Sequence, residues 1–430
     1  MSNRFSTHRY MSYLTVVFLN AFVDIGHKIL IQDIFYQTAT PKIYTIMSAL
    51  INAMILLPFV LFFTPSGYLS DKFSKTKVMR WTALAAIPLT IFITLFYYAG
   101  YFWLAFTMTF LLSVQATINS PAKYGYIKEL FGKEKLAEAN AYVQTIAIIS
   151  ILAGTVVFTI FFQMLISHYG AAALTSKTEI MKIIAPSGFI LILMSSLEYV
   201  LTLFLNVKPA ADPQSTFKFK QYIHGDYIRA NMNSIYTNKV IFGCIIALGF
   251  FWGINQVILA NYGAYLKIYI HHASAMFAQG SLALGGVGIL LGALVAGRSS
   301  KHFIESGIIP IATLGMTVGL FFMPIINNKT LVLLVFFMYG FFGGMLIVPL
   351  NALIQFNSPN HKLGKILAAN NFVQNVFMIV LLVMTAATAL MNFNPVVCFK
   401  FLFLIGIIAT IYAIISLPQS MVRYLTYSVL

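Results

Sequence analysis

Two residues of opposite charge lie close together in the first long apolar run of this chain. Asp24 and Lys28 are four positions apart, so on a helix their side chains share one face and can pair directly. A zwitterionic ligand needs an anion for its amine and a cation for its phosphate, and a low dielectric strengthens both contacts. We therefore predict that this pair binds substrate. The alternative is a mutually satisfied pair that only fixes helix packing.

Further polar residues lie within apolar runs. Glu198 is a second acid of this kind, which can carry a proton or bind an amine, or can equally reach for water from a helix end. His27 lies near Asp24, but each helical residue turns by about 100°, so a packed histidine is favoured over one that titrates near neutral pH. Unpaired amides are costly in lipid, so Asn and Gln in these runs turn toward a ligand or toward neighbouring helices. The candidate substrate-binding residues are Asp24, Lys28, Asn20, Glu198, Asn52, Gln115, Gln144, Asn255 and Gln374.

The elements that position these residues must be membrane-spanning helices. Of the 430 residues, 60% are hydrophobic and 9% are charged, and the mean hydropathy is +0.85. No soluble domain of this length would show such values, and helices satisfy their own backbone hydrogen bonds in lipid, so we predict an all-α membrane protein. The formal net charge of +16 would suit nucleic acid, but the basic residues are spread among loops, so we expect no nucleic-acid partner.

No residue pattern predicts catalysis or metal binding. Cys244 and Cys398 lie in apolar surroundings and are interpreted as small buried hydrophobic residues. Neither a nucleophile with its base nor a set of residues at metal-ligand spacing occurs in the sequence. We therefore expect no enzymatic activity, no metal ion and no cofactor.

Twelve apolar runs are each long enough to cross a hydrocarbon core of ~30 Å, which takes roughly 20 helical residues. They lie near 11–36, 43–63, 79–99, 101–120, 139–166, 186–207, 240–262, 273–296, 308–325, 330–350, 368–391 and 396–417. The hexapeptide Ala-Asn-Ala-Tyr-Val-Gln at 139–144 aligns without a gap with Ala-Asn-Asn-Phe-Val-Gln at 369–374. This repeat predicts two pseudo-symmetric six-helix halves, 1–207 and 240–430, joined by a central loop at 208–239, with the ligand between the halves.

The distribution of Lys and Arg predicts the orientation of the chain. Twenty of these 27 residues lie at the termini and the even-numbered junctions, six lie on the other side, and Lys28 lies within a run. The positive-inside rule then places both termini and the central loop in the cytoplasm. Arg4 and Arg9 lead directly into the first run, so we expect no cleavable signal peptide. In the central loop, a solvated linker is favoured over an amphipathic helix on the anionic inner leaflet.

The loop between the second and third runs reads Gly-Tyr-Leu-Ser-Asp-Lys-Phe-Ser-Lys-Thr-Lys at 67–77. It resembles the Gly-x-Leu-Ala-Asp-Arg-x-Gly-Arg-Lys loop of the major facilitator superfamily, with Ser74 in place of the second glycine. The resemblance implies a major facilitator fold of twelve transmembrane helices. Gly67 would allow close helix contact, and Asp71 would cap a helix start and pair with cations, as a latch that holds one transport state.

Other residues are expected to act with Asp71 in gating. Arg298 lies in the corresponding loop of the second half, as a cationic gate partner or, equally, as a positive-inside anchor. Asn140, Asn351 and Asn370 are interpreted as helix caps and interface locks. The candidate gating residues are Gly67, Asp71, Lys72, Lys75, Lys123, Asn140, Arg298, Asn351 and Asn370.

A narrower resemblance covers essentially the whole chain. Pro-Ala-Lys-Tyr-Gly at 121–125, followed by Leu-Ala-Glu-Ala-Asn at 136–140, is similar to a loop of the bacterial lysophospholipid transporter (LplT-type) family. Glu-Ser-Gly-Ile-Ile-Pro at 305–310 and the segments 343–355 and 18–28 also resemble that family. Within 18–28 this chain departs from the family pattern around Asp24 and Lys28, at Val23, Ile25 and His27. The head-group preference can therefore differ.

This resemblance implies that the chain moves lysophospholipids, notably lysophosphatidylethanolamine, across the bacterial inner membrane to the cytoplasmic leaflet by alternating access. A separate cytoplasmic acyltransferase would then re-acylate the lipid, because this chain lacks the His-x4-Asp signature of such an enzyme. We expect a monomer surrounded by membrane lipids. One rival is a proton-coupled exporter of amphiphilic drugs, with Asp24 or Glu198 as proton carrier. Another is a scaffold that recruits the acyltransferase through the 121–138 loop.

Overall fold

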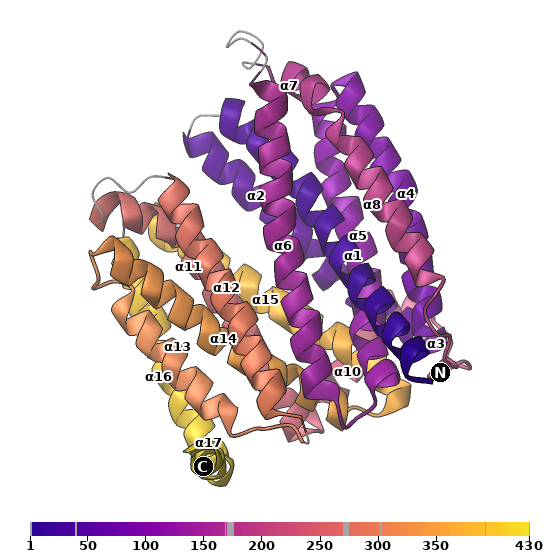
Figure 1. Cartoon of the computed structure of the whole chain (residues 1–430), viewed down its shortest axis with the longest axis vertical. Helices are drawn as coiled ribbons and strands as arrows, with labels where there is room; N and C mark the ends of the chain where they lie inside the picture. The colour runs from indigo at the N-terminus through magenta and orange to yellow at the C-terminus, as the bar shows by residue number, and fades with distance from the viewer. Residues whose placement is uncertain are drawn as a thin grey trace. The chain divides into compact units, whose positions relative to one another are not determined.

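The computed structural model of the chain is helical throughout the part that it describes (Figure 1). The structure describes residues 2–38, 41–167, 169, 176–269, 275–301, 303–391 and 393–429. In these ranges the regular elements are α-helices, apart from the short 3₁₀ helix η2 (Asn360–Lys362). Helices are the expected element, because lipid offers no hydrogen-bond partner to an unpaired backbone group.

The chain divides into two compact units. Unit 1 comprises Met1–Leu130, Ile149–Met232 and Pro359–Phe372, and unit 2 comprises Phe131–Ile148, Asn233–Ser358 and Val373–Leu430. Each unit is drawn mainly from one of the two predicted halves and includes a short segment of the other. The division into 1–207, 208–239 and 240–430 stays a prediction.

Among the described residues, ten helices come before residue 239. They are α1 (Ser2–Thr38), α2 (Pro41–Leu61), α3 (Phe63–Lys72), α4 (Lys75–Ala99), α5 (Phe102–Phe131), α6 (Leu136–Ile166), α7 (Lys177–Ile184), α8 (Ser187–Thr202), α9 (Phe219–Ile223) and α10 (Asp226–Tyr236). Two neighbouring pairs are sharply bent, α2 with α3 by 54° and α7 with α8 by 52°. The central loop therefore contains two short helices, α9 and α10, rather than a continuous linker.

Seven α-helices follow in the described part of the chain. They are α11 (Lys239–Tyr269), α12 (Ala275–Ser299), α13 (Ile308–Phe322), α14 (Lys329–Asn357), α15 (Leu363–Leu390), α16 (Pro395–Ser416) and α17 (Pro418–Val429). Nine helices of the described residues are long and apolar enough to cross a membrane, or up to 11 spans if each bent pair is one. With the shorter apolar helix α13, these elements coincide with all twelve predicted runs, although residues 273 and 274 of the eighth run lie outside the described residues.

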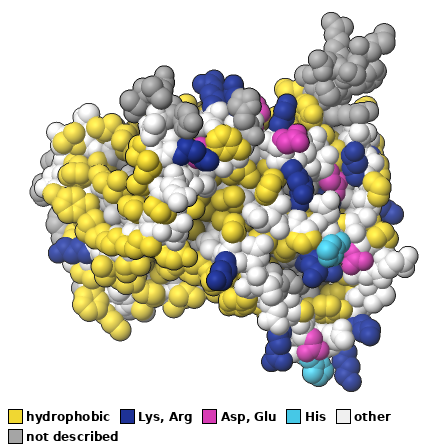
Figure 2. All heavy atoms as spheres, turned by 90° about the horizontal axis from the view of Figure 1, so that it is seen from below, with side chains coloured by type: hydrophobic (Ala, Val, Ile, Leu, Met, Phe, Trp, Pro, Cys, Tyr) yellow, Lys and Arg dark blue, Asp and Glu magenta, His cyan; other side chains and the backbone are white. Residues whose placement is uncertain are grey.

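The outward surface of these helices is apolar, as expected for contact with lipid. Figure 2 shows one face on which hydrophobic side chains cover broad areas. Several large apolar side chains of these helices are more than half exposed, among them Leu95, Ile160, Ile408 and Ile415. The chain is therefore a multi-pass membrane protein, and its interior is held together by contacts that do not depend on removing apolar surface from water.

Inside each unit, short polar contacts join neighbouring helices. In unit 1 the hydroxyl oxygens of Thr90 on α4 and Ser195 on α8 are 3.0 Å apart. In unit 2 those of Thr317 on α13 and Thr410 on α16 are 2.9 Å apart. Ser and Thr are suited to this role in a membrane, because a small hydroxyl lets helices approach closely and hydrogen-bonds across the interface.

Glycines bring α12 and α14 into backbone contact within unit 2. A Cβ atom added to Gly288 would collide with the carbonyl group of Phe337, and one added to Gly292 with that of Phe341. From the other helix, a Cβ at Gly344 would collide with the carbonyl oxygen of Ile289. No side chain can be placed at these positions unless the helices separate, so this interface requires glycine for close packing.

We expect Gly292→Val to destabilise the protein by about 1–3 kcal/mol, because it overpacks the α12–α14 interface. The measurement is thermal or denaturant unfolding of the protein in detergent. Gly280→Val on the same helix is the matched control, since a Cβ there has nothing within 4 Å. Equal loss of stability in both variants would contradict the close-packing role of Gly292.

Candidate functional site

A polar cluster lies in unit 1 where α1, α5 and α8 meet, with Asn20 and Glu198 buried and Asp24 and Lys123 half-buried. Asn20 and Glu198 are 3% and 1% exposed. The Lys123 ammonium donates to Asn20 Oδ1 at 3.4 Å, and the Asn20 amide is hydrogen-bonded to the Glu198 carboxylate. Asp24 interacts electrostatically with Lys123 and with Glu198. The cluster therefore contains two acids, one lysine and one amide.

This cluster has capacity for a further cation. Glu198 Oε2 is buried and has no hydrogen-bond partner among the described residues, although burying a polar atom without a partner is costly. The two carboxyl groups of Asp24 and Glu198 share the single ammonium of Lys123. An incoming ammonium group would supply the missing donor to this oxygen.

The predicted direct pair of Asp24 and Lys28 is wrong. Among the residues that the structure describes, no ion pair within 4.0 Å joins their side chains. The spacing of four places the two Cβ atoms on one helix face, but it does not bring the charged ends of the side chains together. The cation near Asp24 is Lys123 of α5, which sequence analysis had placed among the gating residues. A role of Asp24 and Lys28 in substrate binding stays a prediction.

The remaining predicted binding residues of unit 1 lie on neighbouring helices. Gln115 of α5 donates from Nε2 to the Thr82 carbonyl of α4 at 3.0 Å, and its Oε1 has no partner among the described residues. Asn52 is partly buried on α2. Gln115 thus ties two helices together while it keeps one free acceptor.

The predicted binding residues of unit 2 are divided among three helices. Asn255 donates to the Phe251 carbonyl of its own helix, α11, at 2.8 Å. Gln144 on α6 and Gln374 on α15 are partly buried. Their role as ligand contacts stays a prediction.

His27 is a packed histidine, which confirms the favoured interpretation. It is fully buried, with Nε2 3.1 Å from the Ala105 carbonyl and Nδ1 2.7 Å from the Tyr97 hydroxyl. A carbonyl only accepts, so Nε2 carries the hydrogen, and in the neutral imidazole Nδ1 then accepts from the Tyr97 hydroxyl. The ring connects α1 to α4 and α5.

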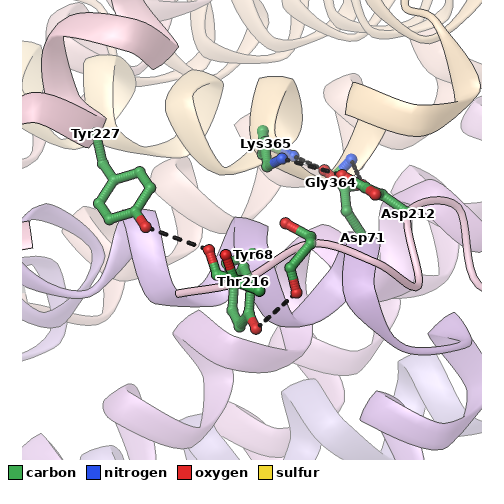
Figure 3. Close-up of polar contacts among 8 residues, drawn as sticks. Tyr68, Asp71, Asp212, Thr216, Tyr227, Gly364 and Lys365 are labelled. Atoms are coloured by element: carbon green, nitrogen blue, oxygen red, sulfur yellow. Dashed lines mark hydrogen bonds and ion pairs between the residues drawn. The ribbon is translucent and has the colours of Figure 1, made fainter. Parts of the chain in front are cut away.

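Asp71 caps the start of α15, as the sequence predicts for a helix start. Its carboxylate accepts from the Gly364 amide at 2.7 Å and from the Lys365 amide at 3.0 Å (Figure 3). A Cβ on Gly364 would meet Asp71 Oδ1, and one on Gly67 would meet the Lys365 backbone. The two glycines therefore permit the close approach, and a carboxylate at a helix N-terminus is electrostatically favourable.

The central loop covers the same junction. Asp212 donates its amide to the Asp71 carbonyl at 2.8 Å, and its carboxylate lies 3.7 Å from the Lys365 ammonium (Figure 3). The Tyr68 hydroxyl donates to the Ser215 carbonyl at 3.2 Å. Asp212 was not predicted as a functional residue, because the only signal for it in the sequence is an acid in a mostly basic loop. The loop is thus attached to the helix cap that Asp71 forms.

The basic residues near Asp71 have partners within unit 1. Lys75 is 2% exposed, and its ammonium lies 2.8 Å from Glu129 of α5. Lys72 places its ammonium over the ring of Tyr68, 5.4 Å from the centroid. Lys75 therefore joins α4 to α5, and its gating role stays a prediction.

An amide pair joins the first turn of α6 to the last turn of α14 in unit 2. Asn140 donates to Gln355 Oε1 at 3.1 Å, and Gln355 donates back to Asn140 Oδ1 at 2.9 Å. Asn351 donates to a carbonyl of its own helix, Asn370 is buried on α15, and Arg298 is exposed on α12. The contacts of Asn140 are those of a lock between helices, whereas gating by these residues stays a prediction.

Comparison with known proteins supplies the family. The profile of the Major Facilitator Superfamily matches residues 13–382. The lysophospholipid transporter LplT of Salmonella arizonae is 25% identical over 383 residues, which is 86% of each chain. LplT of Klebsiella pneumoniae (strain 342) is 25% identical over 290 residues, or 66% of this chain and 67% of that one.

Solved structures show the same fold at low sequence identity. The E. coli fucose:proton symporter FucP superposes with a TM-score of 0.71 at 14% identity, over 93% of this chain and 98% of that one. A bacterial homologue of the iron transporter ferroportin, in the outward-facing state, gives a TM-score of 0.67 at 14% identity, over 98% and 99%. At this identity the likeness shows the fold alone.

We expect Tyr97→Phe to destabilise the protein by about 1–3 kcal/mol, because it leaves buried His27 Nδ1 without a donor. Unfolding in detergent measures the change. Tyr98→Phe is the matched control, since Tyr98 is 48% exposed. A Tyr97→Phe variant as stable as its control would show that the hydrogen bond is not structural.

We expect Asp71→Ala to speed hydrogen exchange at the start of α15, because the Gly364 and Lys365 amides lose their acceptor. Loss of a helix cap costs about 0.5–2 kcal/mol, which corresponds to roughly 2- to 30-fold faster exchange. Mass spectrometry of a peptide that covers 363–368 reports this change. Asp226→Ala is the control, because Asp226 is an exposed acid in the first turn of α10. Unchanged exchange in Asp71→Ala would contradict the cap.

Proposed function

Because the chain belongs to the major facilitator superfamily, we propose that it is a secondary transporter for lysophospholipids that works by alternating access. The proposed direction is toward the cytoplasmic leaflet of a bacterial inner membrane, where a separate acyltransferase would re-acylate the lipid. The names of the relatives support this substrate class. The observation that carries the proposal is the partly buried cluster of Asn20, Asp24, Lys123 and Glu198.

The cluster suits the head group of lysophosphatidylethanolamine. The lipid ammonium would bind the carboxylates of Asp24 and Glu198, where Glu198 Oε2 has an unused acceptor. The lipid phosphate would bind the ammonium of Lys123, with Lys28 as a second cation on α1. Charge-assisted contacts of this kind are about twice as strong as neutral ones, and buried ionisable groups within membrane helices commonly mark substrate pathways. The acyl chain would remain on apolar helix faces.

In this proposal the cap on α15 is the latch of the transport cycle. Asp71 accepts both backbone amides, and Asp212 pairs with the side chain of Lys365. Any movement of the start of α15 away from α3 must break these contacts together. Asp212 therefore adds a contact from the central loop to the gating role proposed for Asp71.

A proton-coupled exporter of amphiphilic drugs is the second candidate. The observation that favours it is the pair of acids, Asp24 and Glu198, beside a single lysine, since such a group can take up one proton or one organic cation. Strict dependence on a pH gradient, together with transport of cationic drugs, would support this candidate over the first.

Uptake of labelled lysophosphatidylethanolamine into proteoliposomes tests the proposal. We expect uptake by the wild type and a loss of at least about tenfold, or 1.4 kcal/mol, in Asp24→Asn and in Lys123→Gln. Each substitution removes one of the charges that would bind the zwitterionic head group.

Lys135→Gln is the matched control for Lys123→Gln, because Lys135 is exposed in the loop between α5 and α6. It should keep wild-type uptake at equal reconstitution. Absence of uptake by the wild type under every ion gradient would overturn the lipid assignment. Uptake that survives in Lys123→Gln would overturn the role of Lys123.

A further inference from the structure

The C-terminal helix α17 contacts the rest of unit 2 through its polar side. A Cβ added to Gly307, at the start of α13, would collide with the Ser420 carbonyl and with Cβ of Tyr424. The Arg423 guanidinium donates to Glu305 Oε1 at 2.8 Å. These three residues of α17 lie within about 100° of arc on a helical wheel, so they form one face, and that face is turned toward the loop before α13.

Arg423 is held at this contact by Glu305 and by an aromatic ring, while its side chain stays 43% exposed. Glu305 is 4% exposed and also accepts from the Gly307 amide at 3.0 Å. The guanidinium carbon of Arg423 lies 4.7 Å from the centroid of the Phe303 ring. Arg423 is the single charged residue in the sequence of α17, so the helix lacks the row of cations that draws an amphipathic helix to an anionic surface.

The opposite side of α17 is apolar. Met421, Val422 and Leu425 follow the spacing of one helical face, and Val422 and Leu425 are 59% and 46% exposed. A helix on the surface of a water-soluble protein has the reverse arrangement, with its apolar stripe toward the protein. The outward face of α17 therefore requires an apolar environment.

The position of α17 in the chain identifies that environment. The preceding span, α16, has 22 residues, or about 33 Å at ~1.5 Å per residue, which matches a hydrocarbon core of ~30 Å. Leu417 alone separates the two helices, and its non-helical backbone breaks the axis. In Figure 1, α17 is seen nearly end-on at the foot of α16. It thus begins where α16 leaves the hydrocarbon and runs across the direction of the span.

We propose that α17 is an interfacial anchor that binds the lipid surface at the leaflet where α16 ends, which the Lys and Arg distribution predicts to be cytoplasmic. Met421, Val422 and Leu425 insert among the upper acyl carbons. The Glu305–Arg423 pair holds the polar side of the helix on the loop between α12 and α13. The binding is apolar, so it needs no anionic lipid and resists salt. It does not depend on the proposed substrate.

Spin-label accessibility in the full-length protein tests the anchor. Single cysteines replace Val422 or Leu425 in a background with Cys244→Ala and Cys398→Ala, and the protein is reconstituted in phosphatidylcholine vesicles. We expect collisions with oxygen, which partitions into lipid, to exceed those with a water-soluble nickel chelate several-fold. The ratio should not change in 1 M salt.

Two labelled controls set the scale. Ile408→Cys on α16 reports lipid, because Ile408 is 61% exposed on a span, and Glu134→Cys reports water, because Glu134 is exposed in the loop between α5 and α6. The proposal would be overturned if the label at Val422 had the same oxygen-to-nickel collision ratio as the label at Glu134. It would also be overturned if neither reagent reached the label, because that result indicates a covering protein surface. With Glu305→Gln, we expect greater mobility of the Val422 label at an unchanged ratio. If the collision ratio of the Val422 label in Glu305→Gln fell to that of the Glu134 site, apolar binding of α17 would be overturned.

Discussion

A polar group between membrane helices has no water to bind, so its stability depends on partners supplied by other helices. The polar cluster of unit 1 follows this constraint, since Asn20 and Lys123 from different helices satisfy each other beside two acids. Glu198 Oε2 is the exception, without a partner among the described residues. In the proposed transporter, a group that the resting protein leaves unsatisfied is a group that a zwitterionic lipid can satisfy.

The same constraint explains the helix ends. A helix start exposes amides that need acceptors, and the start of α15 receives them from the carboxylate of Asp71 on α3. Asp212 adds a contact from the central loop through Lys365. A contact that depends on a few directed hydrogen bonds can be broken and remade at modest cost, as a transport latch requires. Apolar packing such as the glycine contact of α12 and α14 suits the permanent interfaces instead.

The lipid surface acts on this chain in two ways. Within the spans it requires apolar outward faces, of which Ile408 is an example. Beyond the last span, the proposed anchor α17 uses the interface itself, with Arg423 turned toward Glu305 and Val422 turned away. The polarity of each face of a helix in this protein is therefore understood only with the bilayer included as a partner.

The sequence by itself determined the membrane class, the twelve apolar runs and the ability of Asp71 to cap a helix, because hydropathy and short motifs are local properties. Only the tertiary structure decided the partners. Asp24 interacts with Lys123 rather than with Lys28, and Asp71 meets an amide 293 positions away. Helical periodicity indicates which residues share a face, but it cannot indicate which other helix that face meets. The pairing of buried charges is a property of helix packing, and that packing emerges only when the whole chain is folded.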